Sequence, residues 1–203
     1  VIFSALELGF VYALVALALF LSFRVLNIAD MTTDGAFTLG CAVSATLAVA
    51  GHPLLALPAA MAAGACAGAV TAFLQTRLRI PSILAGILTQ LMLYSVNLLT
   101  LGGKSLMAID PRANKLLVHM SNNPMAIVSL GIIVTATIVV LYLFFYTEVG
   151  LTLKSTGDNP DMSRAQGVDV NRNKVIGLAI SNGIVALAGA LLAQYKGSAN
   201  IND

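Results

Sequence analysis

The stretch GAFTLGCAVSATLAVAGHPLLALPAAMAAGACAGAVTAFLQT, residues 35–76, contains no Asp, Glu, Lys or Arg in 42 residues. As one α-helix it would extend about 63 Å, twice the roughly 30 Å hydrocarbon core of a bilayer. Gly51, His52 and Pro53 interrupt the run near its middle, and such a Gly/Pro cluster is typical of a turn. The stretch therefore predicts two membrane-spanning helices joined by a tight turn.

The rest of the chain repeats this pattern. It has 9 acidic and 11 basic residues in 203, so 10% of its residues are charged, against about 25% in soluble domains. Further uncharged apolar runs occupy residues 8–23, 80–103, 125–146 and 175–195. This composition excludes a soluble or disordered protein, and a net charge of +2 without a basic run gives no reason to expect a nucleic-acid partner. We predict an all-α fold, a polytopic transmembrane helical bundle of about six spans, in one domain covering residues 1–203.

The basic residues of the connecting loops predict the orientation. Residues 75–80 and residues 147–174 are separated by two spans and therefore lie on the same side of the membrane. Their basic residues are Arg77, Arg79, Lys154, Arg164, Arg172 and Lys174. Because cytoplasmic loops carry an excess of Lys and Arg, we place both loops in the cytoplasm and residues 102–124 outside. At the outer surface, Asp110 and Pro111 are expected to open a short amphipathic helix.

Small residues indicate how the helices pack. Ala60, Gly64, Gly68 and Ala72 recur every four positions, which places them on one face of the third span. Such a face lets a second helix approach closely, and close approach is how helices associate where lipid supplies no hydrophobic drive. We expect these four residues to form a helix-packing surface.

Polar groups inside the spans have two interpretations. Gln90, Tyr94 and Asn97 share one face of the fourth span, and Asn182 lies within the sixth. An amide in hydrocarbon without a partner costs several kcal/mol, so these side chains must face protein or water. They either form hydrogen bonds between helices or line a translocation path.

The segment between the first two spans leaves the same choice open. Asn27, Asp30 and Asp34 lie there, just before the uncharged stretch. Residues of these types cap helix starts, and transporters present such starts to substrates at mid-membrane. The two cysteines and two histidines are isolated in the sequence, so we expect no metal site.

The loop at residues 149–174 contains the pattern of a complete short helix. Asn159 can cap it, Pro160 suits its first position, Asp161 favours its positive end and Gly167 stops it. A capped two-turn helix between two spans suits contact with a soluble partner, although a surface helix without a partner remains an alternative.

This loop carries a resemblance to a known family. GDNPDMSRAQGVDV, residues 157–170, followed by Lys174 and a glycine-rich span, resembles the cytoplasmic coupling loop of bacterial ABC importer permeases of the branched-chain amino acid/ribose type. The opening spans agree, with Asn27 and the DMTTDG motif at residues 30–35. Within the family, the chain is most similar to an uncharacterised amino-acid-type subgroup, some members of which are linked to aromatic amino acids.

The resemblance implies a permease subunit in the bacterial cytoplasmic (inner) membrane. It would move a small solute, an amino acid or a related compound, that an extracytoplasmic binding protein delivers to a pair of permease subunits, expected to be a homodimer. The chain has no Walker A pattern, so it is expected to be no enzyme and to hold no cofactor, with ATP on a partner ATPase subunit. The residues expected to contact that ATPase are Asn159, Pro160, Asp161, Met162, Arg164, Gln166 and Gly167.

The resemblance also bears on the extent of the chain and on the alternatives. Members of the family usually continue for several tens of residues, so we expect the sequence to be C-terminally incomplete. An ion-coupled secondary transporter or channel is the alternative function. It would need ionisable groups inside the spans, whereas the spans contain no acid except Glu7.

Overall fold

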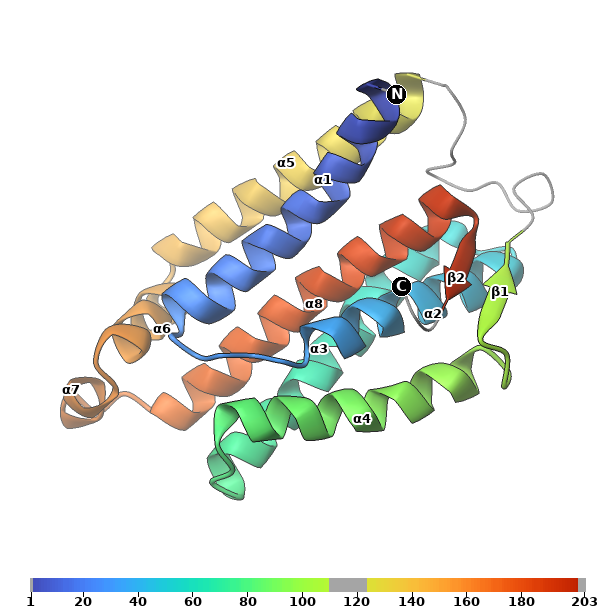
Figure 1. Ribbon diagram of the computed structural model, residues 1–203. Coiled ribbons are helices and arrows are strands. Elements are labelled where there is room, and N and C mark those ends of the chain that lie inside the picture. The colour runs from blue at the N-terminus through green and yellow to red at the C-terminus, as the bar shows by residue number, and fades with distance from the viewer. Residues whose placement is uncertain (1, 110–123, 201–203) are drawn as a thin grey trace.

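The computed structural model describes residues 2–109 and 124–200 and is a bundle of helices (Figure 1). The elements in chain order are α1 (Ile2–Leu19), the π-helix η1 (Phe20–Val25), α2 (Thr33–Val49), α3 (Pro53–Arg77), α4 (Ser82–Thr100), β1 (Leu106–Ala108), α5 (Pro124–Tyr146), α6 (Glu148–Asp158), α7 (Pro160–Ala165), α8 (Val170–Lys196) and β2 (Ser198–Asn200). The predicted outer helix opened by Asp110 and Pro111 lies outside the described residues.

The uncharged stretch divides where the sequence predicts. α2 ends at Val49, Gly51 turns the chain with a φ of 84°, and Pro53 opens α3. A positive φ is readily adopted by glycine, and proline suits a first helical position.

The spans agree with the prediction in kind, and α2 differs from it in length. Within the part of the chain that the structure describes, five helices are long and apolar enough to cross a membrane, while α2 is a shorter apolar helix of 17 residues. It extends about 26 Å, slightly less than a hydrocarbon core. The missing length precedes it, because the chain from the end of η1 to Thr32 is not helical.

α8 lies at the centre of the bundle (Figure 1), with α1 on one side and α2 and α3 on the other. The four small residues of α3 lie against it: Ala60 and Ala72 have no exposed surface, and added Cβ atoms on Gly64 and Gly68 would meet the backbone of α8. On Gly68, the Cβ would lie 3.0 Å from the Cα of Ala179. The absence of side chains at these positions therefore allows the two helices to touch backbone to backbone.

The loop at residues 149–174 is more helical than the sequence indicated. It contains α7, as predicted, and also most of α6, which was not predicted. Thr147 caps α6 by accepting a hydrogen bond from the backbone N–H of Gly150, and Asp169 caps α8 by accepting from the N–H groups of Asn171 and Arg172.

One small feature departs from an all-helical chain. β1 and β2 pair antiparallel, with Met107 opposite Ala199. Three-residue strands leave too short an alternating pattern to be recognised in a sequence. This pairing ties the segment after α4 to the end of α8.

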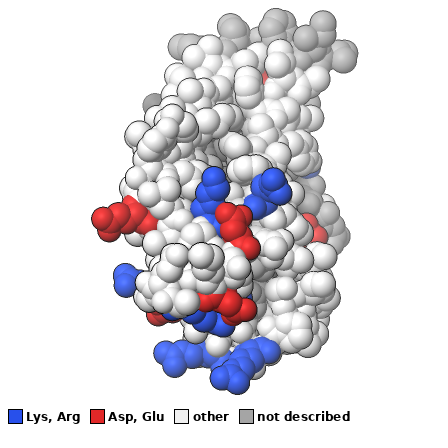
Figure 2. All heavy atoms as spheres, turned by 90° about the vertical axis from the view of Figure 1, so that its left-hand side faces the viewer, with Lys and Arg blue, Asp and Glu red and all other residues white. Residues whose placement is uncertain are grey.

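The two basic loops lie at the same end of the bundle, as predicted. α3 ends and α4 begins near the end at which α6 and α7 lie (Figure 1). Seen from this end, Lys and Arg side chains lie intermingled with Asp and Glu side chains, and the lowest part of the face carries Lys and Arg (Figure 2). The two loops therefore share one side, and the assignment of that side to the cytoplasm stays a prediction from their Lys and Arg residues.

Candidate functional site

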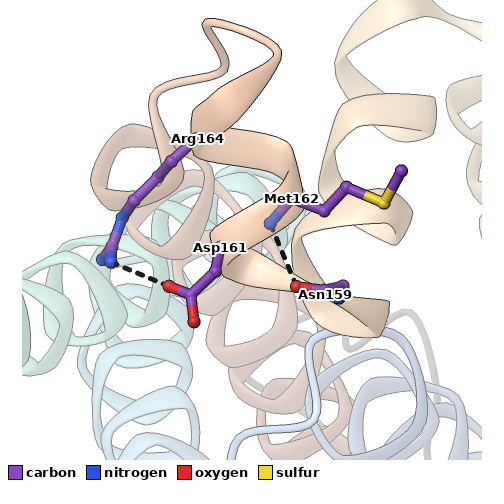
Figure 3. Close-up of polar contacts among 4 residues, drawn as sticks. All are labelled: Asn159, Asp161, Met162 and Arg164. Carbon is purple, nitrogen blue, oxygen red and sulfur yellow. Dashed lines mark hydrogen bonds and ion pairs between the residues drawn. The ribbon is translucent and has the colours of Figure 1, made fainter.

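α7 is a capped helix held at the basic end of the molecule. The side chain of Asn159 accepts a hydrogen bond of 3.0 Å from the backbone N–H of Met162, and Gly167 adopts a φ of 83° just beyond the last turn (Figure 3). Arg164 and Asp161 form an ion pair of 3.4 Å. Both side chains are exposed, so this pair contributes little to stability.

The residues expected to contact a partner all face outward. They are Asn159, Pro160, Asp161, Met162, Arg164, Gln166 and Gly167, and each is exposed. Met162 is 61% exposed and is the long apolar side chain on this outward face. Ser163 points inward instead and shares a hydrogen bond of 2.9 Å with Ser155 of α6.

α6 attaches α7 firmly to the bundle. Leu153 has no exposed surface and packs in a cluster with residues of η1, α3 and α8. Asn173 of α8 donates a hydrogen bond of 2.9 Å to the hydroxyl of Thr156. Force applied to α7 would therefore reach the membrane helices through packed contacts.

A second candidate site is a groove between α1, α2 and α4, with Val185 of α8 on its wall. It encloses about 600 Å³. Polar side chains of all three helices line it: Tyr12 on α1, Thr33, Asp34 and Thr38 on α2, and Gln90, Tyr94 and Asn97 on α4. The first turn of α2 lies in this groove. Thr32 is the N-cap residue of α2, and its side chain makes no capping hydrogen bond.

The groove contains four of the seven predicted path residues. Asp34, Gln90, Tyr94 and Asn97 come from separate parts of the sequence and line one space. Asn97 is 1% exposed; its amide donates a long hydrogen bond of 3.4 Å to the carbonyl of Gly35, and its Oδ1 has no hydrogen-bond partner among the described residues. A buried amide that is only half satisfied is costly unless another group completes it.

The other three predicted path residues do not line the groove. Asn27 is exposed in the non-helical segment, with a φ of 54°. Asp30 is 1% exposed and accepts two hydrogen bonds, of 2.9 Å from the N–H of Thr32 and of 2.6 Å from the amide of Asn182. For Asn182 this is the first of the two interpretations, a hydrogen bond between elements, and the carboxylate of Asp30 is its partner.

Sequence reasoning missed several residues of both regions. Tyr12 and Thr38 line the groove but occur within apolar runs, where nothing in the sequence marks them. Thr71 shares a hydrogen bond of 2.9 Å with Thr32 from the middle of α3. For Thr32 and Thr33, the sequence did contain a signal, because both stand beside Asp34 at the predicted helix start. Among the described residues, no group of His, Cys, Asp or Glu could hold a metal ion.

Comparison with known proteins identifies the family of the chain. The family model described as "Branched-chain amino acid transport system / permease component" matches residues 1–203. No solved structure matches the chain.

Two relatives show the range of the family. A tyrosine transport system permease protein of Clostridioides difficile (strain R20291) is 32% identical over 203 residues, which cover 99% of this chain and 67% of that protein. The ribose import permease protein RbsC of Escherichia coli (strain K12) is 24% identical over 204 residues, covering 98% of this chain and 62% of that protein. With five helices suited to crossing a membrane among residues 2–109 and 124–200, the chain is a multi-pass membrane protein that belongs to the family of branched-chain amino acid transport permease components.

Proposed function

We propose that this chain is the transmembrane subunit of an ATP-binding-cassette importer and that α7 docks on its ATPase subunit. The observation that carries the proposal is the presentation of α7. Its exposed face consists of the predicted contact residues, while Ser163 and α6 hold it to the bundle. Met162 would supply the apolar centre of the contact, and the ion-paired Asp161 and Arg164 its polar rim. ATP binds on the partner, and this chain receives the resulting motion.

The groove supports a path shared with a second permease subunit. It is not fully enclosed by the described residues, and exposed polar side chains on it, such as those of Asp34 and Tyr94, would otherwise face lipid. Uncompensated polar groups in hydrocarbon are costly. A second copy placed over the groove would turn two grooves into one enclosed passage. We therefore propose a homodimer with the passage at its interface.

An amino acid is the substrate that this groove suits. The free N–H groups at the start of α2 can hold a carboxylate, and the exposed carboxylate of Asp34 beside them can attract an ammonium group. The name of the Clostridioides difficile relative, a tyrosine transport permease, favours the same class. An extracytoplasmic binding protein would deliver the amino acid to the end of the bundle opposite α7.

The ATPase contact is tested by breaking α7. Ala165→Pro removes a backbone donor and clashes with the preceding turn, whereas Ala165→Ser keeps the helix. Each variant is purified with the ATPase subunit encoded beside it. We expect Ala165→Pro to lose ATPase retention or stimulation at least tenfold, with Ala165→Ser close to wild type. Normal assembly and stimulation by Ala165→Pro would contradict the contact.

The path is tested in proteoliposomes that contain the complex, ATP and the binding protein. Asp34→Asn removes the charge, and Asn97→Leu fills the space beside Gly35 with an apolar side chain. We expect both to lower amino acid uptake at least tenfold at equal protein level. Ser95→Ala, an exposed change on α4 away from the groove lining, is the control. Wild-type uptake in both groove variants would leave these residues a structural role only.

A further inference from the structure

The end of η1 and the non-helical residues 26–32 that follow it contact α6 directly. A Cβ atom added to Gly157 of α6 would lie 2.9 Å from the carbonyl carbon of Val25 and 3.1 Å from the Cα of Leu26. Leu26 and Ile28 also share a buried cluster with Leu153 of α6. Since the space at Gly157 has no room for a methyl group, the backbone of α6 lies against Val25 and Leu26 with no side chain between them, and α6 cannot shift toward the bundle without moving residues 25–28.

Hydrogen bonds attach the same segment to three helices. The hydroxyl of Ser22 in η1 donates to the carbonyl of Ile28 at 3.1 Å. Thr32 shares a hydrogen bond with Thr71 of α3, and Asp30 accepts from Asn182 of α8. The segment is thus defined in position although it has no regular secondary structure.

The segment leads directly into the groove. Residues 33–35, which follow it, are the first turn of α2 and line the groove. The segment therefore contacts α6 at one end and ends at the groove at the other. Its preceding turns form a π-helix, a conformation that often marks a functional site in a helix.

We propose that residues 25–32 transmit movement of α6 and α7 to the start of α2, and that the hydrogen bond between Asp30 and Asn182 is the contact with α8 that positions the segment during this movement. Asp30 is accordingly a positioning residue, whereas Asp34, four residues later, faces the groove. The inference rests on the proposed function, because it assumes that α7 receives motion from an ATPase.

The chemistry of the contact suits this role. The carboxylate of Asp30 forms no ion pair with any described Lys or Arg, and Thr32 and Asn182 are its two hydrogen-bond donors. Charge-assisted hydrogen bonds are short, directional and strengthened by a low-dielectric surrounding. Asn182 also donates 3.0 Å to the carbonyl of Leu178 one turn earlier, while its Oδ1 has no partner among the described residues. Its amide is therefore fixed in rotation by α8 itself.

The test separates coupling from assembly. The reconstituted complex with ATPase and binding protein is assayed for uptake per ATP hydrolysed, using wild type, Asp30→Asn, Asn182→Asp and the double exchange. Asp30 accepts through both oxygens, so Asp30→Asn leaves an NH2 group facing one of its two donors and removes the charge from the pair, and Asn182→Asp places two carboxylates together. We expect each single change to keep ATP hydrolysis within about twofold of wild type while uptake per ATP falls at least tenfold. The double exchange restores an amide–carboxylate pair and should recover at least a third of the uptake.

A second measurement follows the movement itself. A cysteine at Thr33 in a Cys66→Ser background is labelled by a thiol reagent with and without ATP and vanadate. We expect the labelling rate to change severalfold with nucleotide in the otherwise wild-type complex and to stay constant in Asp30→Asn. If nucleotide changes the labelling rate of Asp30→Asn as much as that of wild type, and uptake per ATP equals the wild-type value, the inference is wrong. If the wild-type complex itself shows no ATP-dependent uptake, the proposed function fails instead.

The opposite end of the segment supplies a variant that leaves Asp30 unchanged. Gly157→Ala places a methyl group against the backbone of Val25, while Gly131→Ala on α5 adds one where nothing lies within 4 Å. We expect Gly157→Ala to lower uptake per ATP at least fivefold and Gly131→Ala to leave it unchanged. If Asp30→Asn does not assemble, the two glycine variants test the inference instead. Equal uptake per ATP in Gly157→Ala and Gly131→Ala overturns it.

Discussion

α8 and α5 have almost opposite environments despite similar hydropathy. The mean hydropathy of the most apolar window is 2.2 in α8 and 2.6 in α5, yet 72% of the first and only 11% of the second is buried within the protein. α5 carries Ile, Val, Leu and aromatic side chains outward, such as Ile132 and Val140, which are 63% and 64% exposed. α8 buries small and polar residues, among them Gly189, Ser181 and Gln194.

The difference shows that apolar character does not indicate burial in this bundle. Lipid is as apolar as a leucine side chain, so large aliphatic residues gain little by leaving it. Small residues gain close backbone contact, and polar residues gain hydrogen bonds that lipid cannot offer. The inner helix of the bundle is therefore the less hydrophobic of the two.

The largest expected effect comes from closing a backbone contact of α8. A Cβ on Gly40 of α2 would lie 2.7 Å from the Cα of Ala186. Gly40→Leu should therefore destabilise the fold by about 3 kcal/mol or more. Gly131→Leu on α5 is the matched control, because nothing lies within 4 Å of a Cβ added at Gly131. Monodisperse yield in detergent and the thermal midpoint measure both, and equal losses in the two variants would contradict the difference between the helices.

Truncation of a large side chain should have a smaller effect. Leu191 of α8 has no exposed surface, whereas Leu143 of α5 is 60% exposed. Leu191→Ala should lower the free energy of unfolding by about 2 kcal/mol through lost packing contacts. The hydrophobic contribution is small, because the Leu191 side chain would still lie in lipid if the helices separated. Leu143→Ala should change the thermal midpoint by less than a third as much. A larger loss at Leu143 would indicate that another chain covers α5.

Removal of one buried hydrogen bond should cost less again. The hydroxyl of Ser181 donates 2.8 Å to the carbonyl of Ala18 on α1. Ser181→Val deletes this donor and should destabilise by about 1–2 kcal/mol. Thr135→Val, an exposed change on α5, is the matched control. Thermal unfolding in the same detergent compares them, and no difference would show that the contact between α1 and α8 is maintained by shape alone.

The smallest effect is expected on the surface of α5. Tyr142 and Tyr146 share a hydrogen bond of 2.9 Å between their hydroxyls, and both side chains are exposed. Tyr142→Phe removes it and should change stability by less than about 0.5 kcal/mol. A clear drop in thermal midpoint would mean that this face of α5 is buried in the assembled protein.

The local features were predictable from the sequence because they depend on neighbouring residues. The turn at Gly51 and Pro53 and the helix between Asn159 and Gly167 follow from capping chemistry within a few positions. α6 was not predicted, because Gly150 and Thr152 lower its helix propensity and packing of Leu153 stabilises it. Local propensity is routinely overridden in this way by tertiary contacts.

The grouping of site residues was only partly predictable. Asp30 and Asp34 are equivalent in the sequence, four residues apart at one predicted helix start. One is buried against Asn182 and the other lines the groove. That difference depends on where α8 and α4 pack, which no local pattern encodes. The stripe of Gln90, Tyr94 and Asn97 was recognisable from its helical spacing, but Tyr12 of α1 and Thr38 of α2 were not.

The two cysteines of the chain give it a natural site for spectroscopic labelling. Cys41 is 1% exposed, and its thiol donates to the carbonyl of Gly189, while Cys66 is exposed midway along α3. A membrane-permeable maleimide dye should therefore attach once per unmodified chain, at bilayer depth. Its emission wavelength would report the polarity next to α3, and quenching by brominated lipids would reveal whether lipid or another protein surface covers that helix.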